Sequence, residues 1–197
     1  MKKIPSLFSR DPNNPRVLSD AYHVLADWVV QGMGVATRKW DGTAVLVREG
    51  YLFARFDAKH GKPQPPNFVP AQDPDPATGH HPGWVPATRP EDRWLRAAAE
   101  TMGGIASLAA GTYEACGPKI GGNPEHLADH RLIRHGTDVI EGVPRDKVGL
   151  VEFFKVHDIE GVVWWLRSGD ATSPMIKITG ASLGVERPSP IADKARE

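Results

Sequence analysis

The stretch RKWDGTAVLV, from Arg38 to Val47, places a lysine directly before an Asp-Gly pair and an apolar strand. A lysine amine can act as a nucleophile in covalent catalysis once it is neutral. A free lysine is protonated at neutral pH, so a reactive Lys39 needs a site that favours the neutral amine through burial or nearby positive charge. The plainer interpretation is that Asp-Gly forms a hairpin turn and that Lys39 is a solvated flank.

Three further segments place a charged residue at the edge of an apolar, strand-like run: YEACG at Glu114, EGVVWW at Glu160 and MIKI at Lys177. A charge in such a position is costly unless it has a partner or a chemical task. Each segment alone is a weak signal, because short patterns of this kind arise often by chance. Strand alternation places Tyr113 on the face opposite to Glu114, where we expect it to pack.

The elements that must position these residues follow from the periodicity of the apolar residues. Strands separated by turns are predicted over 34–57, 111–117, 131–136, 160–168 and 173–179. Within the first of these ranges, Glu49-Gly50 is expected to close a hairpin. Helices are predicted over 19–33, 90–102 and 144–158. Clustered hairpins with helices between the groups indicate an α+β fold with largely antiparallel sheets.

Composition narrows the class of protein. The chain has 197 residues, 40% of them hydrophobic and 24% charged, which is typical of a soluble globular protein, and we expect a single domain over 1–197. Acidic and basic residues balance at 24 each, so only local patches can attract nucleic acid. The single cysteine, Cys116, excludes an intramolecular disulfide and a cysteine-based zinc site. No signal peptide or membrane-spanning run is recognised, so we expect a cytoplasmic protein.

Two segments are predicted to lack regular structure. Residues 58–90 are rich in proline, glycine and polar residues and are expected to form a long loop inserted in the domain, a candidate lid over a ligand. His80 and His81 lie within this segment. They do not predict a zinc site, because adjacent histidines on one loop rarely reach the same ion. Residues 186–197 are expected to form a loose tail.

In this order and spacing, KWDG, YEACG, EGVVWW and MIKI resemble the motifs of the covalent nucleotidyltransferase superfamily of polynucleotide ligases and capping enzymes. The likeness is greatest to ATP-dependent RNA ligases and covers roughly residues 35–184. The segments GPKIGGNPEHL and TGHHPGWVP are also similar to segments of small RNA-ligase-like proteins. The resemblance implies a nucleotidyltransferase (adenylation) domain with mainly antiparallel sheets and flanking helices. It also implies ATP and Mg²⁺ (or Mn²⁺) as cofactors and RNA ends, a 5′-phosphate and a 3′-hydroxyl, as partners.

The resemblance assigns roles to the four charged residues. In the family, the lysine of Lys-x-Asp-Gly attacks the α-phosphate of ATP and becomes a lysyl-AMP, and Lys39 has this position. Lys177 matches a lysine that binds the α-phosphate and stabilises charge in the transition state. Glu160 matches an acid that helps to hold the divalent metal. Glu114 matches an acid that accepts a hydrogen bond from a ribose hydroxyl.

Further residues complete the implied nucleotide site. Asp41 and Gly42 would shape the turn, with Gly42 letting backbone approach the nucleotide, although Asp41 is equally well explained as a turn former. Arg55 lies where the family has a basic residue near the ribose and phosphates, and a solvated strand position is its alternative. Arg38 is assigned to the nucleotide site as well. The local basic residues expected to grip RNA are Arg38, Lys59, Lys62 and Arg89.

The chain departs from the family at the fifth motif, where the usual pattern is Lys-x-Lys. Here Lys177 is followed by Thr179 in place of the second lysine, and Met175 is the other position that replaces one. The substitutes for the lost charge are Lys59, Lys62 and, more weakly, Lys119. Leu132 and Ile133 both stay open as the residue beside the adenine.

Three alternative functions remain. A DNA nick ligase and a GTP-using capping-type transferase share the same motifs. A nucleotide- or RNA-end-binding module that kept the fold and lost turnover belongs to another class, and the missing lysine favours it. Lys39, Glu114 and Glu160 argue against loss of turnover, because a binding module has no chemical need for a lysine beside two acids.

Overall fold

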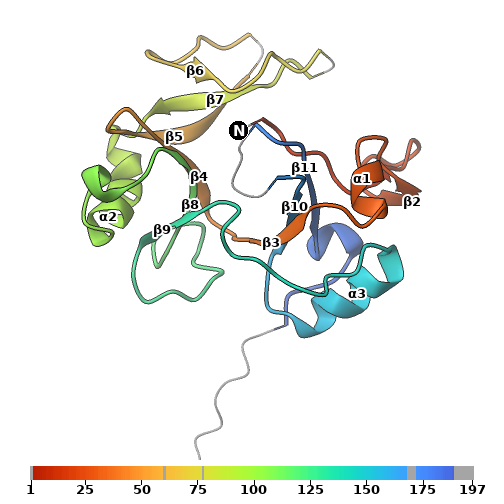
Figure 1. Cartoon of the computed structure of the whole chain (residues 1–197). Coiled ribbons are helices and arrows are strands. Elements are labelled where there is room, and N and C mark those ends of the chain that lie inside the picture. Colours follow the sequence, from red (N-terminus) through yellow and green to blue (C-terminus); the bar gives the residue numbers. More distant parts are fainter. Residues whose placement is uncertain (1, 60, 77, 168–171, 189–197) are drawn as a thin grey trace, which may run out of the picture. The chain divides into compact units, whose positions relative to one another are not determined.

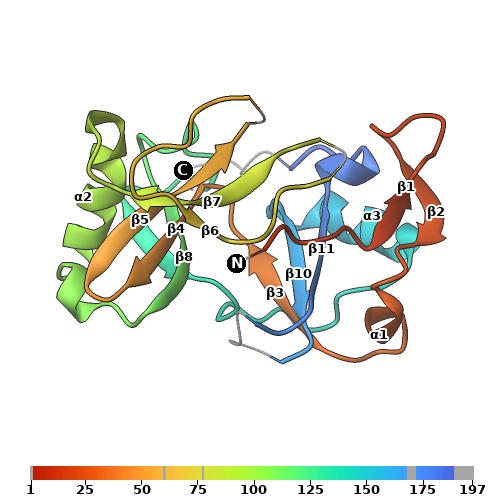
Figure 2. The same cartoon turned by 90° about the horizontal axis from the view of Figure 1, so that it is seen from above.

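The structure is a computed structural model that describes residues 2–59, 61–76, 78–167 and 172–188 (Figures 1 and 2). The chain divides into two compact units: unit 1 is Met1–Lys3 with Trp40–His135, and unit 2 is Ile4–Lys39 with Gly136–Glu197. Both units have antiparallel sheets and few helices, which agrees with the α+β prediction. Neither unit is one continuous stretch of chain, and the single domain over 1–197 stays a prediction.

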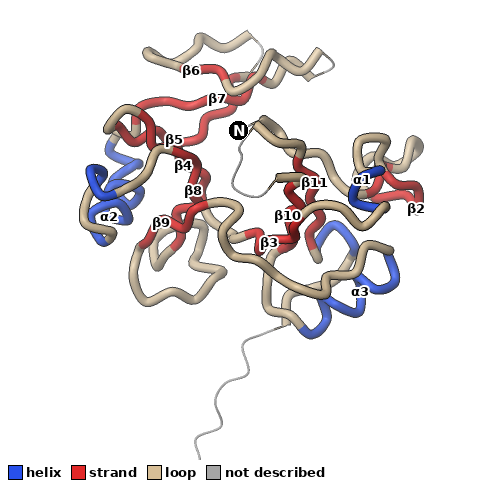
Figure 3. The backbone as a smooth tube through the Cα atoms, in the orientation of Figure 1, coloured by secondary structure: helices blue, strands red, loops and turns tan. Residues whose placement is uncertain are grey.

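Unit 1 is built on a six-stranded antiparallel sheet in the order β6-β7-β5-β4-β8-β9 (Figure 3). Its strands are β4 Thr43–Arg48, β5 Tyr51–Ala58, β6 Val69–Pro70, β7 His81–Pro86, β8 Gly111–Cys116 and β9 Arg131–Arg134. Its helical segments are η1 Pro90–Asp92, α2 Arg93–Thr101 and η2 Ile105–Ser107. The core lies on one face of the sheet, where Leu95, Ala98 and Ala99 of α2 join a buried cluster with Val45 and Tyr113.

Unit 2 contains a three-stranded antiparallel sheet in the order β11-β10-β3 and a two-stranded sheet. The strands are β1 Phe8–Arg10, β2 Leu18–Tyr22, β3 Val35–Lys39, β10 Gly161–Trp165 and β11 Met175–Thr179. The helical segments are α1 Asp27–Val30, α3 Lys147–Val156 and η3 Ala181–Leu183. One face of the three-stranded sheet presents Val162, Trp164 and Ile176 to a core that also contains Leu150 and Phe154 of α3.

Most predicted elements are confirmed, including the helices over 90–102 and 144–158 and the strands that carry the site residues. The Glu49-Gly50 turn closes the β4–β5 hairpin, with φ of 54° and 78° at its two central residues. Positive φ at both positions matches the twist of the flanking strands. The Asp41-Gly42 turn differs, because β3 pairs with β10 while β4 pairs with β5 and β8. The hairpin interpretation of this pair is therefore wrong.

The predicted helix over 19–33 is also wrong. The chain forms β2 and then the short helix α1, and Tyr22 of β2 stacks on Phe8 of β1 with ring centroids 5.0 Å apart. Gly32 and Gly34 have φ of 85° and 80°, which ends the helix. Arg145 donates hydrogen bonds to carbonyls at this end, so tertiary contacts outweigh the local helical spacing.

The structure corrects the prediction of an uninterrupted loop over 58–90. Strand β7 lies inside it and pairs with β5 from Phe53↔Pro86 to Ala58↔His81. Trp84 is only 2% exposed, so an aromatic side chain fixes this segment to the sheet. The prolines in this segment argued against a strand in the sequence. They are tolerated close to the edge of a sheet.

Two remaining expectations concern the ends of the chain and its surroundings. Most of the tail predicted over 186–197 lies outside the described residues, which end at 188. Across the described ranges, no helix combines the length and the apolar character needed to cross a membrane.

Candidate functional site

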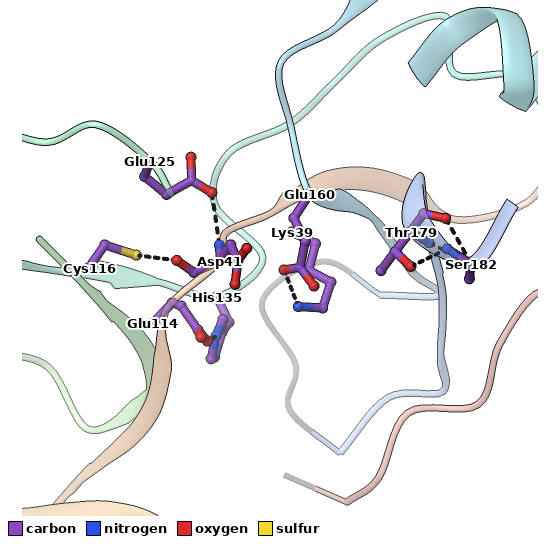
Figure 4. A network of polar contacts seen from close by, with 9 residues as sticks. All are labelled: Lys39, Asp41, Glu114, Cys116, Glu125, His135, Glu160, Thr179 and Ser182. Carbon is purple, nitrogen blue, oxygen red and sulfur yellow. Dashed lines mark hydrogen bonds and ion pairs between the residues drawn. The ribbon is translucent and has the colours of Figure 1, made fainter. Parts of the chain in front are cut away.

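Lys39 and Glu160 meet in unit 2, where two paired strands begin and end. Lys39 is the last residue of β3, and Glu160 directly precedes β10, whose Gly161 is the register partner of Lys39. Lys39 Nζ donates a hydrogen bond to Glu160 Oε2 and forms an ion pair with it (Figure 4). The two side chains stay 25% and 23% exposed. A lysine amine and a carboxylate are thus in contact, and both are partly exposed.

Lys177 lies on the same face of the three-stranded sheet as Lys39. In an antiparallel sheet, residues paired across strands share a face, and so do residues two apart along a strand. Val163 pairs with Lys177 on β11 and with Thr37 on β3, and Thr37 is two residues before Lys39. This face is opposite to the core of unit 2. The two lysines predicted to be catalytic are therefore on one face, which also carries the buried Val163 and Trp165.

Gly161 begins β10, the central strand of this sheet, and the position has no room for a larger residue. A Cβ atom on Gly161 would lie 2.3 Å from the carbonyl oxygen of Ile178. Gly161 also pairs with both Lys39 and Thr179, so it brings β3 and β11 to their common partner strand. The glycine of the EGVVWW segment therefore has a steric reason.

Thr179, in place of the usual second lysine, takes part in a turn. Its Oγ1 accepts a hydrogen bond of 3.2 Å from the backbone N–H of Ser182, and Ser182 Oγ donates one of 2.7 Å to the Thr179 carbonyl. These bonds hold the start of η3 (Figure 4). Thr179 shares the face of Lys39 through Gly161, but it brings a hydroxyl instead of a positive charge.

Arg38 is not brought to this face. It precedes Lys39 on β3, so strand alternation directs it to the opposite side of the sheet. Arg38 Nη2 donates a hydrogen bond of 3.3 Å to the carbonyl of Asp158, whose carboxylate pairs with Arg187 at 2.9 Å. The assignment of Arg38 to the nucleotide site gains no support from these contacts.

In unit 1, the turn after the lysine is fixed by long-range contacts. A Cβ on Gly42 would lie 2.1 Å from the carbonyl oxygen of Ala115, so Gly42 is needed for the approach of β4 to β8. The backbone N–H of Asp41 donates a hydrogen bond of 2.8 Å to Glu125 Oε1. Glu125 is 8% exposed and was not recognised in the sequence, where nothing links it to a residue 84 positions earlier.

Arg55 and Glu114 share the face of the six-stranded sheet that is opposite to α2. Glu114 pairs with Ala44 on β4 and Ile133 on β9, and Arg55 pairs with Trp84 on β7. The guanidinium carbon of Arg55 lies 4.9 Å from the centroid of the Trp84 ring. Burial lowers the pKa of Arg55, and nearby Asp57 opposes the shift. Arg55 is thus a partly buried cation on the face of Glu114, which argues against the solvated alternative.

Glu114 is held by His135, a residue outside the four segments that carry the resemblance. His135 Nε2 lies 2.8 Å from Glu114 Oε2, and the side chains are 16% and 12% exposed (Figure 4). Ile133 lies on the face of Glu114, whereas Leu132 is 3% exposed in the core with Tyr113, which packs as predicted. Of the two residues considered for the adenine, Ile133 alone has access to the face of Glu114.

The carboxylate of Glu160 suits a Mg²⁺ ion that is bound mainly by water and phosphate oxygens. Among the described residues, no group of three or more His, Cys, Asp or Glu side chains is arranged to hold a metal ion. Mg²⁺ binds beside phosphates through one or two carboxylates and keeps several waters. The partly exposed carboxylate of Glu160 suits that mode and does not suit a metal enclosed by protein ligands.

A comparison with models of known protein families finds no match to this sequence, and a comparison with curated proteins finds none either. What the site can do must therefore be judged from its own geometry.

Proposed function

We propose that the protein is an ATP-dependent RNA ligase that works through a covalent lysyl-AMP. The observation that carries the proposal is the placement of Lys39 in contact with Glu160 and on the same sheet face as Lys177. Separate sequence motifs assign each of these residues to the reaction, and the residues lie at positions 39, 160 and 177.

In the first step, Lys39 Nζ attacks the α-phosphorus of ATP. A phosphorus–nitrogen bond forms, the bond to the bridging oxygen breaks, and pyrophosphate leaves with that oxygen and the bonding electrons. Lys39 is an ammonium in its ion pair, so it must lose one proton before the attack, and Glu160 Oε2, which contacts it, is placed to accept that proton. The second proton leaves the nitrogen as the phosphorus–nitrogen bond forms and passes to the departing pyrophosphate or to water. Lys177 would bind the α-phosphate oxygens and stabilise their charge in the transition state.

Two further transfers complete ligation. The 5′-phosphate of an RNA end attacks the phosphorus of lysyl-AMP, which returns the amine of Lys39 and leaves a 5′-adenylated end. A 3′-hydroxyl then attacks the 5′-phosphate, and AMP leaves as the phosphodiester forms. Both steps depend on positioning and charge stabilisation. Mg²⁺ held by Glu160 would supply a charge that screens the phosphate oxygens.

Arg55 and Glu114 of unit 1 are assigned to binding of the nucleoside and its phosphates. Glu114 offers a carboxylate that accepts hydrogen bonds, as a ribose hydroxyl requires. Arg55 offers a positive charge from the same sheet face. Asp41 and Gly42 shape the chain after the nucleophile through Glu125 and β8.

A binding module without turnover is the second candidate, and one observation favours it. Thr179 bonds to Ser182 in the turn before η3, so the fifth motif supplies one lysine to the face of Lys39 where the family supplies two. A protein that binds ATP or RNA ends and forms no lysyl-AMP would match this candidate.

The experiment that separates the two candidates measures the intact mass of the protein after incubation with ATP and Mg²⁺. GTP serves as the nucleotide control, and Lys39→Ala serves as the protein control. We expect a gain of one AMP with ATP, reversed by pyrophosphate and missing in Lys39→Ala. No gain, even in protein first treated with pyrophosphate to strip bound AMP, would reject the ligase. A sealed product from a 5′-phosphorylated, 3′-hydroxyl RNA then distinguishes RNA ligation from DNA joining or capping.

A further inference from the structure

His135 is placed on the face of Glu114 by the continuation of a strand pair. The backbone N–H of His135 donates a hydrogen bond of 3.1 Å to the carbonyl of Thr112, which extends the β8–β9 ladder by one residue. Thr112 is two residues before Glu114 on β8, so the two share a face with His135. Arg134, directly before His135, donates a hydrogen bond of 3.4 Å to the hydroxyl of Tyr113. The chain is therefore held to β8 at His135 itself and at Arg134, which pairs with Tyr113.

The contact between the two side chains has a defined direction. A carboxylate only accepts hydrogen bonds, so the ring proton lies on Nε2 and is donated to Glu114 Oε2 over 2.8 Å. The other ring nitrogen, Nδ1, is fully covered and has no hydrogen-bond partner among the residues that the structure describes. The contact with Glu114 is thus the hydrogen bond that orients the ring among the described residues.

This contact fixes the Glu114 carboxylate in one orientation. The bond to His135 uses Oε2 and leaves Oε1 for a second donor. A site that hydrogen-bonds a substrate hydroxyl discriminates strongly against an analogue that lacks it, since the buried polar group then stays unpaired. At 12% exposure, the Glu114 side chain has little water to replace a lost donor.

We infer that His135 is a positioning residue that holds Glu114 toward a ribose hydroxyl, so that the Glu114–His135 pair sets the preference for ribonucleotides over deoxyribonucleotides. The inference rests on the proposed function for the identity of the nucleotide. It adds a residue and a specificity that the sequence motifs do not contain.

The test measures equilibrium binding in a protein that cannot form lysyl-AMP. In a Lys39→Arg background, calorimetry gives the Kd of ATP, 2′-deoxy-ATP and 3′-deoxy-ATP. We expect ATP to bind roughly tenfold or more tightly than one of the two analogues. His135→Gln places an amide donor near the position of Nε2, and we expect it to keep that preference. His135→Asn carries the same amide closer to the backbone, and we expect it to bind ATP and the analogue within about twofold of each other.

Control variants separate positioning from loss of structure. His126 is an exposed histidine of the same unit, and His126→Ala should leave the preference unchanged. If thermal melting shows that His135→Asn does not fold, His135→Phe fills the volume without a donor and carries the same expectation. Equal preference in the Gln and Asn (or Phe) variants overturns the inference, as does absence of ATP binding or of any preference in the background protein.

The outcome can be distinguished from that of the ligase proposal. If the wild-type protein forms no lysyl-AMP but the ribose preference depends on His135, the inference stands and the covalent mechanism fails. If lysyl-AMP forms and the ribose preference is the same in the His135 variants, the mechanism stands and the inference fails.

Discussion

The two units each contain a basic side chain in contact with a carboxylate, but the two pairs differ in their exposure to water. Lys39 and Glu160 of unit 2 are 25% and 23% exposed, whereas His135 and Glu114 of unit 1 are 16% and 12% exposed. Water competes more strongly for the first pair, so its partners are easier to exchange when a ligand arrives. The second pair is better suited to hold one orientation. The difference favours chemistry at Lys39 and recognition at Glu114.

The two pairs also differ in where they lie along their strands. Lys39 and Glu160 stand at the ends of their strands, where long side chains can move. Glu114 lies within β8, and His135 extends the ladder on β9. Variants that act on one pair should therefore change turnover, and variants that act on the other should change selectivity.

The largest effect is expected from Lys39→Arg. Arginine keeps the positive charge beside Glu160, but its guanidinium stays protonated and is not a nucleophile. We expect complete loss of lysyl-AMP in the intact mass, with the Kd of ATP changed by less than about threefold.

The matched control for this variant is Lys155→Arg. Lys155 also pairs with a glutamate, Glu152 at 2.7 Å, but on the exposed surface of α3. It should keep full labelling. An AMP-sized gain in Lys39→Arg would show that a different residue is the nucleophile.

The next largest effect is expected from Glu160→Gln. The amide keeps the size of the side chain but does not accept the proton of the amine or hold a divalent metal. We expect the rate of lysyl-AMP formation, followed by mass against time, to fall about a hundredfold or more. Glu152→Gln is the control and should leave the rate unchanged. Equal rates in the wild type and Glu160→Gln would show that Glu160, like Glu152, has no part in the reaction.

Local structure was predictable from the sequence where neighbouring residues decide it. Glu49-Gly50 forms the expected turn because two residues with positive φ suffice to close a hairpin. Alternation placed Tyr113 and Glu114 on opposite faces of β8 without knowledge of the partner strands. The charged residues at strand edges were recognisable because an unpartnered charge there is costly.

Contacts between distant segments were not predictable. Glu125 and Asp41 are 84 positions apart, and no local pattern marks Glu125 as the acceptor for a backbone N–H. His135 follows β9 directly, but its role required the register Glu114↔Ile133. The helix predicted over 19–33 failed for the same reason, because Phe8 and Arg145 supply contacts that local spacing does not reveal.

A smaller effect, on stability, is expected from alanine at the two glycines next to the site residues. In Gly42→Ala and Gly161→Ala, the new Cβ meets a backbone carbonyl, at 2.1 Å in unit 1 and 2.3 Å in unit 2. We expect each variant to lose about 1–3 kcal/mol of unfolding free energy in urea titrations, since backbone cannot move aside cheaply. Comparable losses would show that both units depend on close strand approach.

Gly50→Asn is the control for these two variants. Gly50 has φ of 78° and open space around its Cβ position, and asparagine tolerates positive φ. Its unfolding free energy should change by less than about 0.5 kcal/mol. An unchanged urea midpoint for Gly42→Ala would contradict the steric role of Gly42.

The smallest effect is expected at Thr179, which brings a hydroxyl in place of a positive charge to the face of Lys39. Thr179→Ala removes the acceptor for Ser182 and should cost about 1 kcal/mol of unfolding free energy. Thr179→Lys loses the same hydrogen bond but adds a charge on the face of Lys39, so it should form lysyl-AMP severalfold faster than Thr179→Ala when both are fully folded. Thr179→Ser keeps the hydroxyl and should match the wild type in both measurements. Equal rates in the alanine and lysine variants would mean that position 179 does not reach the phosphates, and Lys177 alone would then supply the charge on this face.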